Sequence, residues 1–302
     1  MHVLRTASIA VVAALTWLGS PAHAGDPPAW EAFAKTDLTS DANAALRYWR
    51  AWTFLQEDER AWLQAIDSST LADGDFALDD EGLARLAAEG DTLTMLIEAA
   101  TMERCDFGID YHKGPGALIP HLSAMRLSAF LLAVDARVAF DNGETAKAAT
   151  SLAAGYALAE HCTQDRVLIS ALVGMSIFQL IDDVVQYAED INALDEASRR
   201  TLCAALDRFD DEDPFRVLRS IEMEGRMMSD WWMATARRAD FDLLAGTLDG
   251  AAAGNTVESL VGPMRRATRA DVDAIAAAQV EPFRTYYESV EQAWNQEDAP
   301  RQ

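Results

Sequence analysis

The sequence predicts an all-α fold, built as an array of antiparallel helical hairpins with TPR-like (tetratricopeptide-repeat-like) packing. From about Asp41 onward, apolar residues recur with the spacing of an amphipathic helix almost everywhere. No stretch alternates apolar and polar residues as a half-buried strand does. Short segments join the predicted helices, and this favours antiparallel neighbours in one packed array.

The first helix is predicted to begin after a cap at Ser40 or Asp41 and to run to about Ile66. An acidic loop over residues 67–82 leads into a second helix, from about Asp79 to Met102. The segment MERCDFGIDYHKGPGALIPHL, residues 102–122, then interrupts the helical pattern with a Gly-Pro-Gly break.

A third helix is predicted to start near Pro120, because proline is tolerated in the first turn of a helix. It turns at Asn142-Gly143, and a fourth helix follows to Cys162, which completes a central hairpin. The next helix spans about residues 164–189 and contains fifteen residues without a charge, 167–181. This run is too short for a membrane span and carries polar side chains, so it predicts a central helix buried on most sides.

Three further helices are predicted at about residues 194–209, 212–239 and 271–294. A Gly-rich segment near 246–270 separates the last two and is predicted to be a mobile loop or linker. Residues 25–302 are expected to form a single all-helical domain.

Residues 1–24 have the pattern of a cleaved signal peptide. Arg5 supplies the positive start, an apolar run follows, and Ala22-His23-Ala24 offers a small-x-small cleavage site. The sequence therefore predicts export to the periplasm or the extracellular space, with no membrane span after cleavage.

Acidic side chains dominate the chain, which has 25 Lys and Arg against 49 Asp and Glu and a net charge of −24. Phosphate groups of nucleic acids and anionic lipids are bound through Lys and Arg, so this charge excludes nucleic-acid binding. It favours cations, basic partners and solubility.

The chain has three cysteines, too few for a scaffold built on disulfides. In an oxidising compartment one bridge and one free thiol are expected. Cys105 and Cys162 are the candidate pair, expected at the same end of the central hairpin, and Cys203 is expected to be separate and reduced. The sequence leaves open whether the pair is bonded.

The central hairpin, DARVAFDNGETAKAATSLAAGYALAEH, resembles one unit of a tetratricopeptide-type repeat. Its small residues Ala136, Gly143 and Ala148 are spaced around the turn much as in those repeats. No second copy appears at the repeat's period of about 34 residues.

A wider resemblance is carried by NAALRYWRAW (43–52), RCDFGIDYHKGPGALIPHLSAMR (104–126) and LISALVG (168–174). These segments resemble a family of exported, all-helical bacterial proteins that has no assigned activity. The Cys-Asp-aromatic-Gly opening and the later Gly-Pro and Pro-His-Leu are the most specific features. The resemblance implies a fold and a location, and it supplies no catalytic residues.

Chemistry-bearing residues gather near one end of the predicted hairpin. His121 precedes the turn by about as many residues as Cys162 follows it, and antiparallel helices of matched length bring such ends together. The candidate binding residues at this end are Asp106, Asp110, His112, His121, Arg126 and His161.

The sequence allows three interpretations of this end. Imidazoles, carboxylates and a thiolate could bind a transition metal, but the spacing matches no recognised ligand motif. Cys105 could be a nucleophile helped by His and Asp, although no nucleophile motif frames it. The favoured interpretation is structural, with Asp106 capping backbone donors and glycines permitting the turns. It assigns no metal, no cofactor and no catalytic residue.

The function predicted from the sequence is accordingly that of an exported helical binding or scaffold protein. Its expected partner is a polypeptide or a cell-envelope component, bound in the groove of the hairpin. The alternative is a metal-dependent or cysteine-dependent hydrolase that uses Cys105, His121 and His161.

Overall fold

The computed structural model describes residues 42–74 and 76–238, together with 240, 243, 264, 265, 268, 271, 272, 274–276 and 278. The predicted leader at residues 1–24 lies outside these residues. So do nearly all of the segment 246–270 and most of the helix predicted at 271–294.

The all-α class is confirmed, because the described residues form helices and no strand. One isolated bridge pairs Asn43 with Arg104. In chain order the elements are α3 Ala44–Phe54, α4 Glu57–Ala65, the 3-10 helix η1 Ser68–Ala72, α5 Asp80–Ala88, α6 Gly90–Ala100, the 3-10 helix η2 Tyr111–Gly116, α7 His121–Asp141, α8 Thr145–Thr163, α9 Leu168–Asp190, α10 Glu196–Leu206 and α11 Val217–Arg237.

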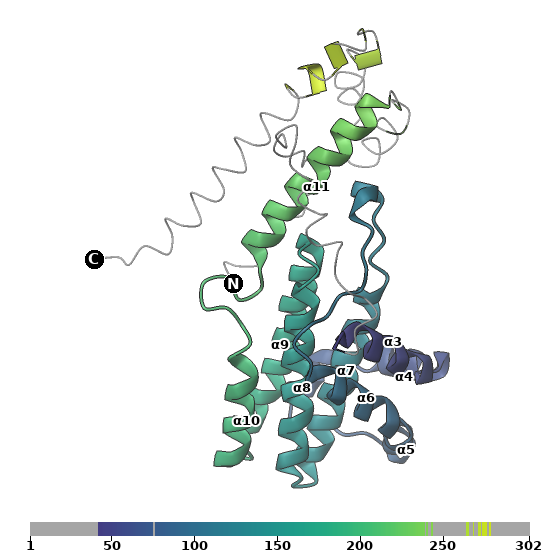
Figure 1. The fold of residues 1–302 in the computed structure, drawn as a ribbon. Helices are drawn as coiled ribbons and strands as arrows, with labels where there is room; N and C mark the ends of the chain where they lie inside the picture. The colour runs from purple at the N-terminus through teal and green to yellow at the C-terminus, as the bar shows by residue number, and fades with distance from the viewer. Residues whose placement is uncertain are drawn as a thin grey trace, which may run out of the picture. The chain divides into compact units, whose positions relative to one another are not determined.

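The chain divides into two compact units. The larger comprises Thr36–Ile109 and Ile119–Val217, and the smaller includes Asp110–Leu118 and the chain from Leu218 onward. In the larger unit α7, α8 and α9 pack on one another, α10 packs against α8, and α6 joins α3 to the hairpin (Figure 1).

The predicted central hairpin is present as α7 and α8, with Gly143 at a φ of 74° in its turn. A positive φ is one that glycine adopts without the clash of a Cβ atom, which explains the glycine here. Ala136 and Ala148 are both fully buried. The hairpin is the centre of the larger unit, since every residue from Ser128 to Arg137 is buried.

The buried stretch of α7 includes a charged residue, Arg137, which is 0% exposed. It bonds to Asp141 on the next turn and to the carbonyl of Asp73 at 3.1 Å. The guanidinium carbon also lies 3.8 Å from the centre of the Tyr187 ring, a cation–π contact. A buried charge is tolerated only with such partners, and here they come from three segments of the chain.

Helix α9 is only partly buried over its whole length. It has a mean hydropathy of 1.8 over its most apolar window, but only 39% of that window is buried. Ile169 is 46% exposed, while Ile177 and Ile181 face the core. By length and composition α9 could cross a membrane, a test that core helices also pass. Within the charge-free run 167–181 only Ile169, Ser176 and Gln179 are exposed, so the prediction of burial on most sides holds for the run, and one face stays open.

Two predicted helices are each divided in the structure. The first begins at Ala44, where the Asn43 side chain accepts a hydrogen bond from the Ala45 amide, and ends at Phe54. Arg60 of α4 donates to the carbonyls of Trp52 and Leu55, which satisfies the open end of α3. The second divides at Glu89, between α5 and α6.

Glycines set how closely α8 and α9 approach. A Cβ atom on Gly174 would lie 2.9 Å from the Ala159 carbonyl oxygen, and one on Gly155 would lie 2.3 Å from Ile181. Neither space accommodates a side chain without movement of a helix or a core residue.

In the smaller unit, η2 packs against α11 through Gly114. Its φ is 52°, and a Cβ atom there would lie 2.4 Å from the ring of Trp231. Trp231 and Trp232 belong to an apolar cluster with Met227, Met228 and Met264.

Candidate functional site

The larger unit has two polar sites on the α7–α8 hairpin. One lies at the open end of the hairpin and the other lies nearer its turn. The first, here called the hairpin-end cluster, lies where α7 begins and α8 ends. It consists of Tyr48, Cys105, His121, Glu160, His161, Cys162, Asp165, Ser170 and Arg208. The second is a pocket nearer the turn of the hairpin.

His161 is buried and both of its ring nitrogens have partners. Nδ1 shares a hydrogen bond of 2.8 Å with the Tyr48 hydroxyl. Nε2 lies 2.8 Å from the Met102 carbonyl oxygen and 2.9 Å from the guanidinium of Arg208. Burial, followed by the Arg208 charge, lowers the pKa of His161 to about 3. The ring is therefore neutral at physiological pH and has no free nitrogen for a ligand.

His121 is also buried, at the first position of α7. Its Nε2 lies 2.6 Å from Oδ2 of Asp165, and the same oxygen accepts from the Ser170 hydroxyl at 2.9 Å. Phe107 stacks on the imidazole with ring centres 4.0 Å apart. Aspartate is at the centre of this trio, so the serine hydroxyl faces a carboxylate and not the imidazole base that would activate it.

Glu160 is a buried carboxylate that two arginines neutralise. Arg216 donates to it at 2.6 Å, and Arg208 lies 3.7 Å from its other oxygen. Gln164 links this carboxylate to the loop, because its amide nitrogen donates to the Glu103 carbonyl and its oxygen accepts from the Cys105 amide. The loop is thus fastened to the end of α8.

Cys105 and Cys162 reach the same end of the hairpin, as predicted, and both are buried. They are not bonded to each other in this structure, and all three thiols are free. The Cys162 thiol donates to the Ser170 carbonyl at 3.3 Å instead. Burial first, and then nearby acidic groups, raise the pKa of both thiols well above its ordinary value. These surroundings oppose the thiolate that a cysteine nucleophile needs.

The remaining predicted residues lie in different surroundings. Asp106 accepts from the Gly108 amide at 2.8 Å, the backbone-capping role expected of it. Asp110 pairs with Lys113 at 3.5 Å, and both it and the exposed His112 belong to the smaller unit. Arg126 is exposed on α7.

No group of three or more His, Cys, Asp and Glu side chains in the described part of the chain is placed to hold a metal ion. At the hairpin end the reason is visible, since the imidazoles and carboxylates are committed to tyrosine, arginine, serine and backbone groups. The cluster holds α3, the Cys105 loop, α7, α8 and α10 together, and this is a structural task.

The pocket lies between α5 and α6 on one side and the hairpin on the other, with a volume of about 520 Å³. This volume is within the range of small-ligand sites. The apolar part of its wall is made by Leu83, Leu86, Leu93, Ile97 and Val138. Gly90 lies on the wall as well, and a Cβ atom there would meet open space.

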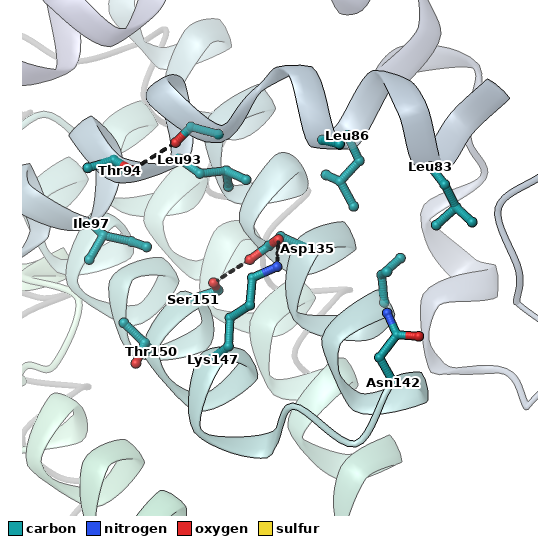
Figure 2. A pocket seen from close by; sticks show the side chains of 13 residues that line it. Leu83, Leu86, Leu93, Thr94, Ile97, Asp135, Asn142, Lys147, Thr150 and Ser151 are labelled. Carbon is teal, nitrogen blue, oxygen red and sulfur yellow. Dashed lines mark hydrogen bonds and ion pairs between the residues drawn. The ribbon is translucent and has the colours of Figure 1, made fainter. Parts of the chain in front are cut away.

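One buried carboxylate is the polar centre of the pocket. Asp135 of α7 is 2% exposed. Its Oδ2 accepts from the Ser151 hydroxyl at 2.7 Å, and its Oδ1 lies 2.9 Å from the ammonium of Lys147. Figure 2 shows Asp135 between these two side chains of α8, facing the apolar residues of α6. The arrangement combines apolar walls with one charged anchor, as binding pockets do.

Sequence reasoning did not single out Asp135, Lys147 or Ser151 as site residues. The sequence does contain a pattern that could have indicated this site. Asp135 is a charged residue in the middle of an apolar helix, and the helix that pairs with it carries Lys147 and Ser151 one turn apart. For the hairpin-end cluster, Tyr48 and Asp165 were also missed. Comparison of the chain with models of protein families, with curated proteins and with solved structures gave no match.

Proposed function

We propose that this chain is an exported, non-catalytic binding protein that holds a polypeptide or another cell-envelope component in the pocket between α5, α6 and the hairpin. The observation that carries the proposal is the contrast between the two polar sites. The hairpin-end cluster is buried and its groups satisfy one another, whereas the pocket has about 520 Å³ of space beside Asp135.

The chemistry of the hairpin end supports binding over hydrolysis. A hydrolase that uses Cys105, His121 or His161 needs a thiolate or a base that reaches a substrate. The thiol pKa values are raised, and both imidazoles are buried behind their partners. A cell-envelope location rests on the leader pattern of residues 1–24 and remains part of the proposal.

Affinity capture with the full-length chain tests this function. The variant Gly90→Leu places a side chain in the open space of the pocket wall, and Gly74→Leu is the matched control, since its Cβ also meets nothing and it lies outside the pocket. We expect a component of envelope extract to be retained by the wild type and by Gly74→Leu, and retention by Gly90→Leu to fall about tenfold or more.

Equal retention by the three proteins would contradict binding in this pocket. Hydrolysis of a peptide or ester probe that disappears in Cys105→Ala would replace the proposal by the hydrolase alternative. Circular dichroism of each variant verifies that the helices remain intact.

A further inference from the structure

We infer that the pocket recognises a primary ammonium group carried on an apolar chain, and that Lys147 holds the place of that ammonium on Asp135. The inference rests on the proposed binding function and adds the chemical class of the ligand. It follows from three features of the pocket: an immobile carboxylate, a replaceable lysine and apolar walls.

The carboxylate is fixed in place. Asp135 lies on the most buried stretch of α7, and the Ser151 hydroxyl of α8 binds one of its oxygens at 2.7 Å. A buried carboxylate is stable only with a charged or hydrogen-bonding partner for its remaining lone pairs. The second oxygen is directed to the pocket and requires a cation with N–H donors, which is the part Lys147 plays at 2.9 Å.

The lysine is replaceable. Its side chain is 53% exposed, whereas that of Asp135 is 3% exposed. Lys147 also lies 3.9 Å from Glu144, so on leaving Asp135 its ammonium has both water and a carboxylate within reach. The lysine stem is flexible, and half-exposed pairs contribute little to stability. When a ligand ammonium takes the place of the lysine ammonium, Asp135 is paired with one positive charge before and after the exchange.

The walls account for the rest of the ligand. Leu86 and Leu93 are nearly fully buried beside the carboxylate, and Ile97 and Val138 continue the apolar surface. An alkyl chain placed there leaves water, and each methylene adds to the affinity. The net charge of −24 raises the local concentration of cations around the whole chain.

This chemistry has two sources, a free alkylammonium amphiphile or a lysine side chain within an apolar segment of a polypeptide. The probes therefore include octylammonium and the end-blocked tripeptide leucyl-lysyl-leucine, with its Nε-acetylated form as control. Octyltrimethylammonium keeps the charge but has no N–H donor, and octanol keeps the chain but has no charge.

Calorimetric titration of the full-length wild type is expected to show octylammonium binding at least about tenfold more tightly than octyltrimethylammonium or octanol, because only the primary ammonium donates to Asp135. Removal of the competing ammonium in Lys147→Met is expected to tighten binding by about five- to tenfold. Asp135→Asn is expected to weaken it by about tenfold or more.

In Lys147→Met the buried carboxylate of Asp135 lacks its cation, and this variant can therefore fail to fold. The double variant Asp135→Asn/Lys147→Met removes both charges, so it has no unpaired buried carboxylate and serves as the second test. It is expected to bind octylammonium no better than octanol. The peptide arm identifies the source: binding of the tripeptide that acetylation abolishes assigns the site to lysine-bearing polypeptides, and binding of octylammonium alone assigns it to free amphiphiles.

Equal affinity of the wild type for octylammonium and octyltrimethylammonium would overturn the inference, because it would show attraction to the acidic surface alone. Unchanged octylammonium binding in Asp135→Asn would do the same. If capture from envelope extract is lost in Gly90→Leu yet kept in Asp135→Asn, the binding function stands and only the ammonium specificity fails.

Discussion

His161 shows how a single residue is constrained by its surroundings. Its ring is in contact with Tyr48 on α3, the Met102 carbonyl in the loop and Arg208 after α10. Arg208 in turn lies 3.7 Å from Glu160, which also pairs with Arg216. Burial and the arginine charge lower the pKa of His161 to about 3. The folded state therefore holds a neutral imidazole that the unfolded chain protonates near pH 6.5.

This difference predicts the sign of one contribution to the pH dependence of stability. Since the unfolded state binds the extra proton, the contribution is complete above about pH 6.5 and is lost as the pH falls toward 3. Between pH 7 and pH 5 the wild type should lose about 2 kcal/mol more unfolding free energy than His161→Gln. Urea unfolding at both pH values measures the difference.

Carboxylates also titrate below pH 5, so the comparison of the two proteins, not the wild-type curve alone, isolates His161. Tyr48→Phe is the control, because it removes a hydrogen bond of the ring but leaves the titrating group. Parallel curves for the wild type and His161→Gln would show that the imidazole is not held neutral.

Residue types at the hairpin end were predictable, but their partners were not. Helix length alone placed His121, His161, Cys105 and Cys162 at a common end. The Tyr48 hydroxyl reaches His161 across 113 residues of sequence, and a pairing of that kind depends on tertiary packing that local patterns do not contain. The candidate bridge shows the same limit: a shared end does not decide whether two thiols bond, and the Cys162 thiol donates to the Ser170 carbonyl instead.

At the scale of elements, the contact of α8 with α9 depends on glycine. Gly174→Ala would bring a methyl group to 2.9 Å from the Ala159 carbonyl oxygen and 2.8 Å from Thr163. Alanine favours a helix intrinsically, but forcing two packed helices apart costs more than this gain. We expect the free energy of unfolding to fall by about 1–2 kcal/mol, measured by urea denaturation.

Gly90→Ala is the matched control for this prediction, because Gly90 is also helical and its Cβ would meet nothing within 4 Å. Its stability should rise by up to about 1 kcal/mol from helix propensity. A gain in both variants would mean that α8 and α9 are less closely packed than the structure has them.

The spacing of apolar residues predicts most of the helices, but it does not predict where two of them are interrupted. The break after Phe54 is stabilised by Arg60, whose guanidinium satisfies two carbonyls at the end of α3. Helical spacing continues through such a break, so periodicity merges the two helices. At Glu89 the following Gly90 was a usable local signal, since glycine commonly follows the end of a helix.

At the scale of the whole molecule, the helix at the centre differs from the one that the sequence predicts, and the reason is physical. The charge-free run predicts α9 as the central helix, whereas α7 is the centre and contains Asp135 and Arg137. A charged residue in a helix argues against a core position, because burial of an unpaired charge costs free energy. This cost is offset here by partners, which are Ser151 for Asp135, and Asp141 and Tyr187 for Arg137. TPR-like packing remains a prediction.

The large negative charge has a consequence for stability that is also a property of the whole chain. With a net charge of −24, folding brings like charges closer together, and salt screens their repulsion. Raising NaCl from 20 to 200 mM should increase the free energy of unfolding in urea by about 1 kcal/mol. A decrease would indicate that specific ion pairs, such as Arg47 with Glu98, outweigh the general repulsion.

The hydrogen bond between Tyr48 and His161 closes the longest loop among the hydrogen bonds described above. Helices α7, α8 and α9 are consecutive in the chain and pack on one another, so their contacts form with little loss of chain entropy. Closure of a loop of 113 residues is entropically costly and gains contacts only on a surface that already exists. We therefore expect the larger unit to assemble outward from the hairpin, with α3 added to a preformed nucleus as a late step of folding.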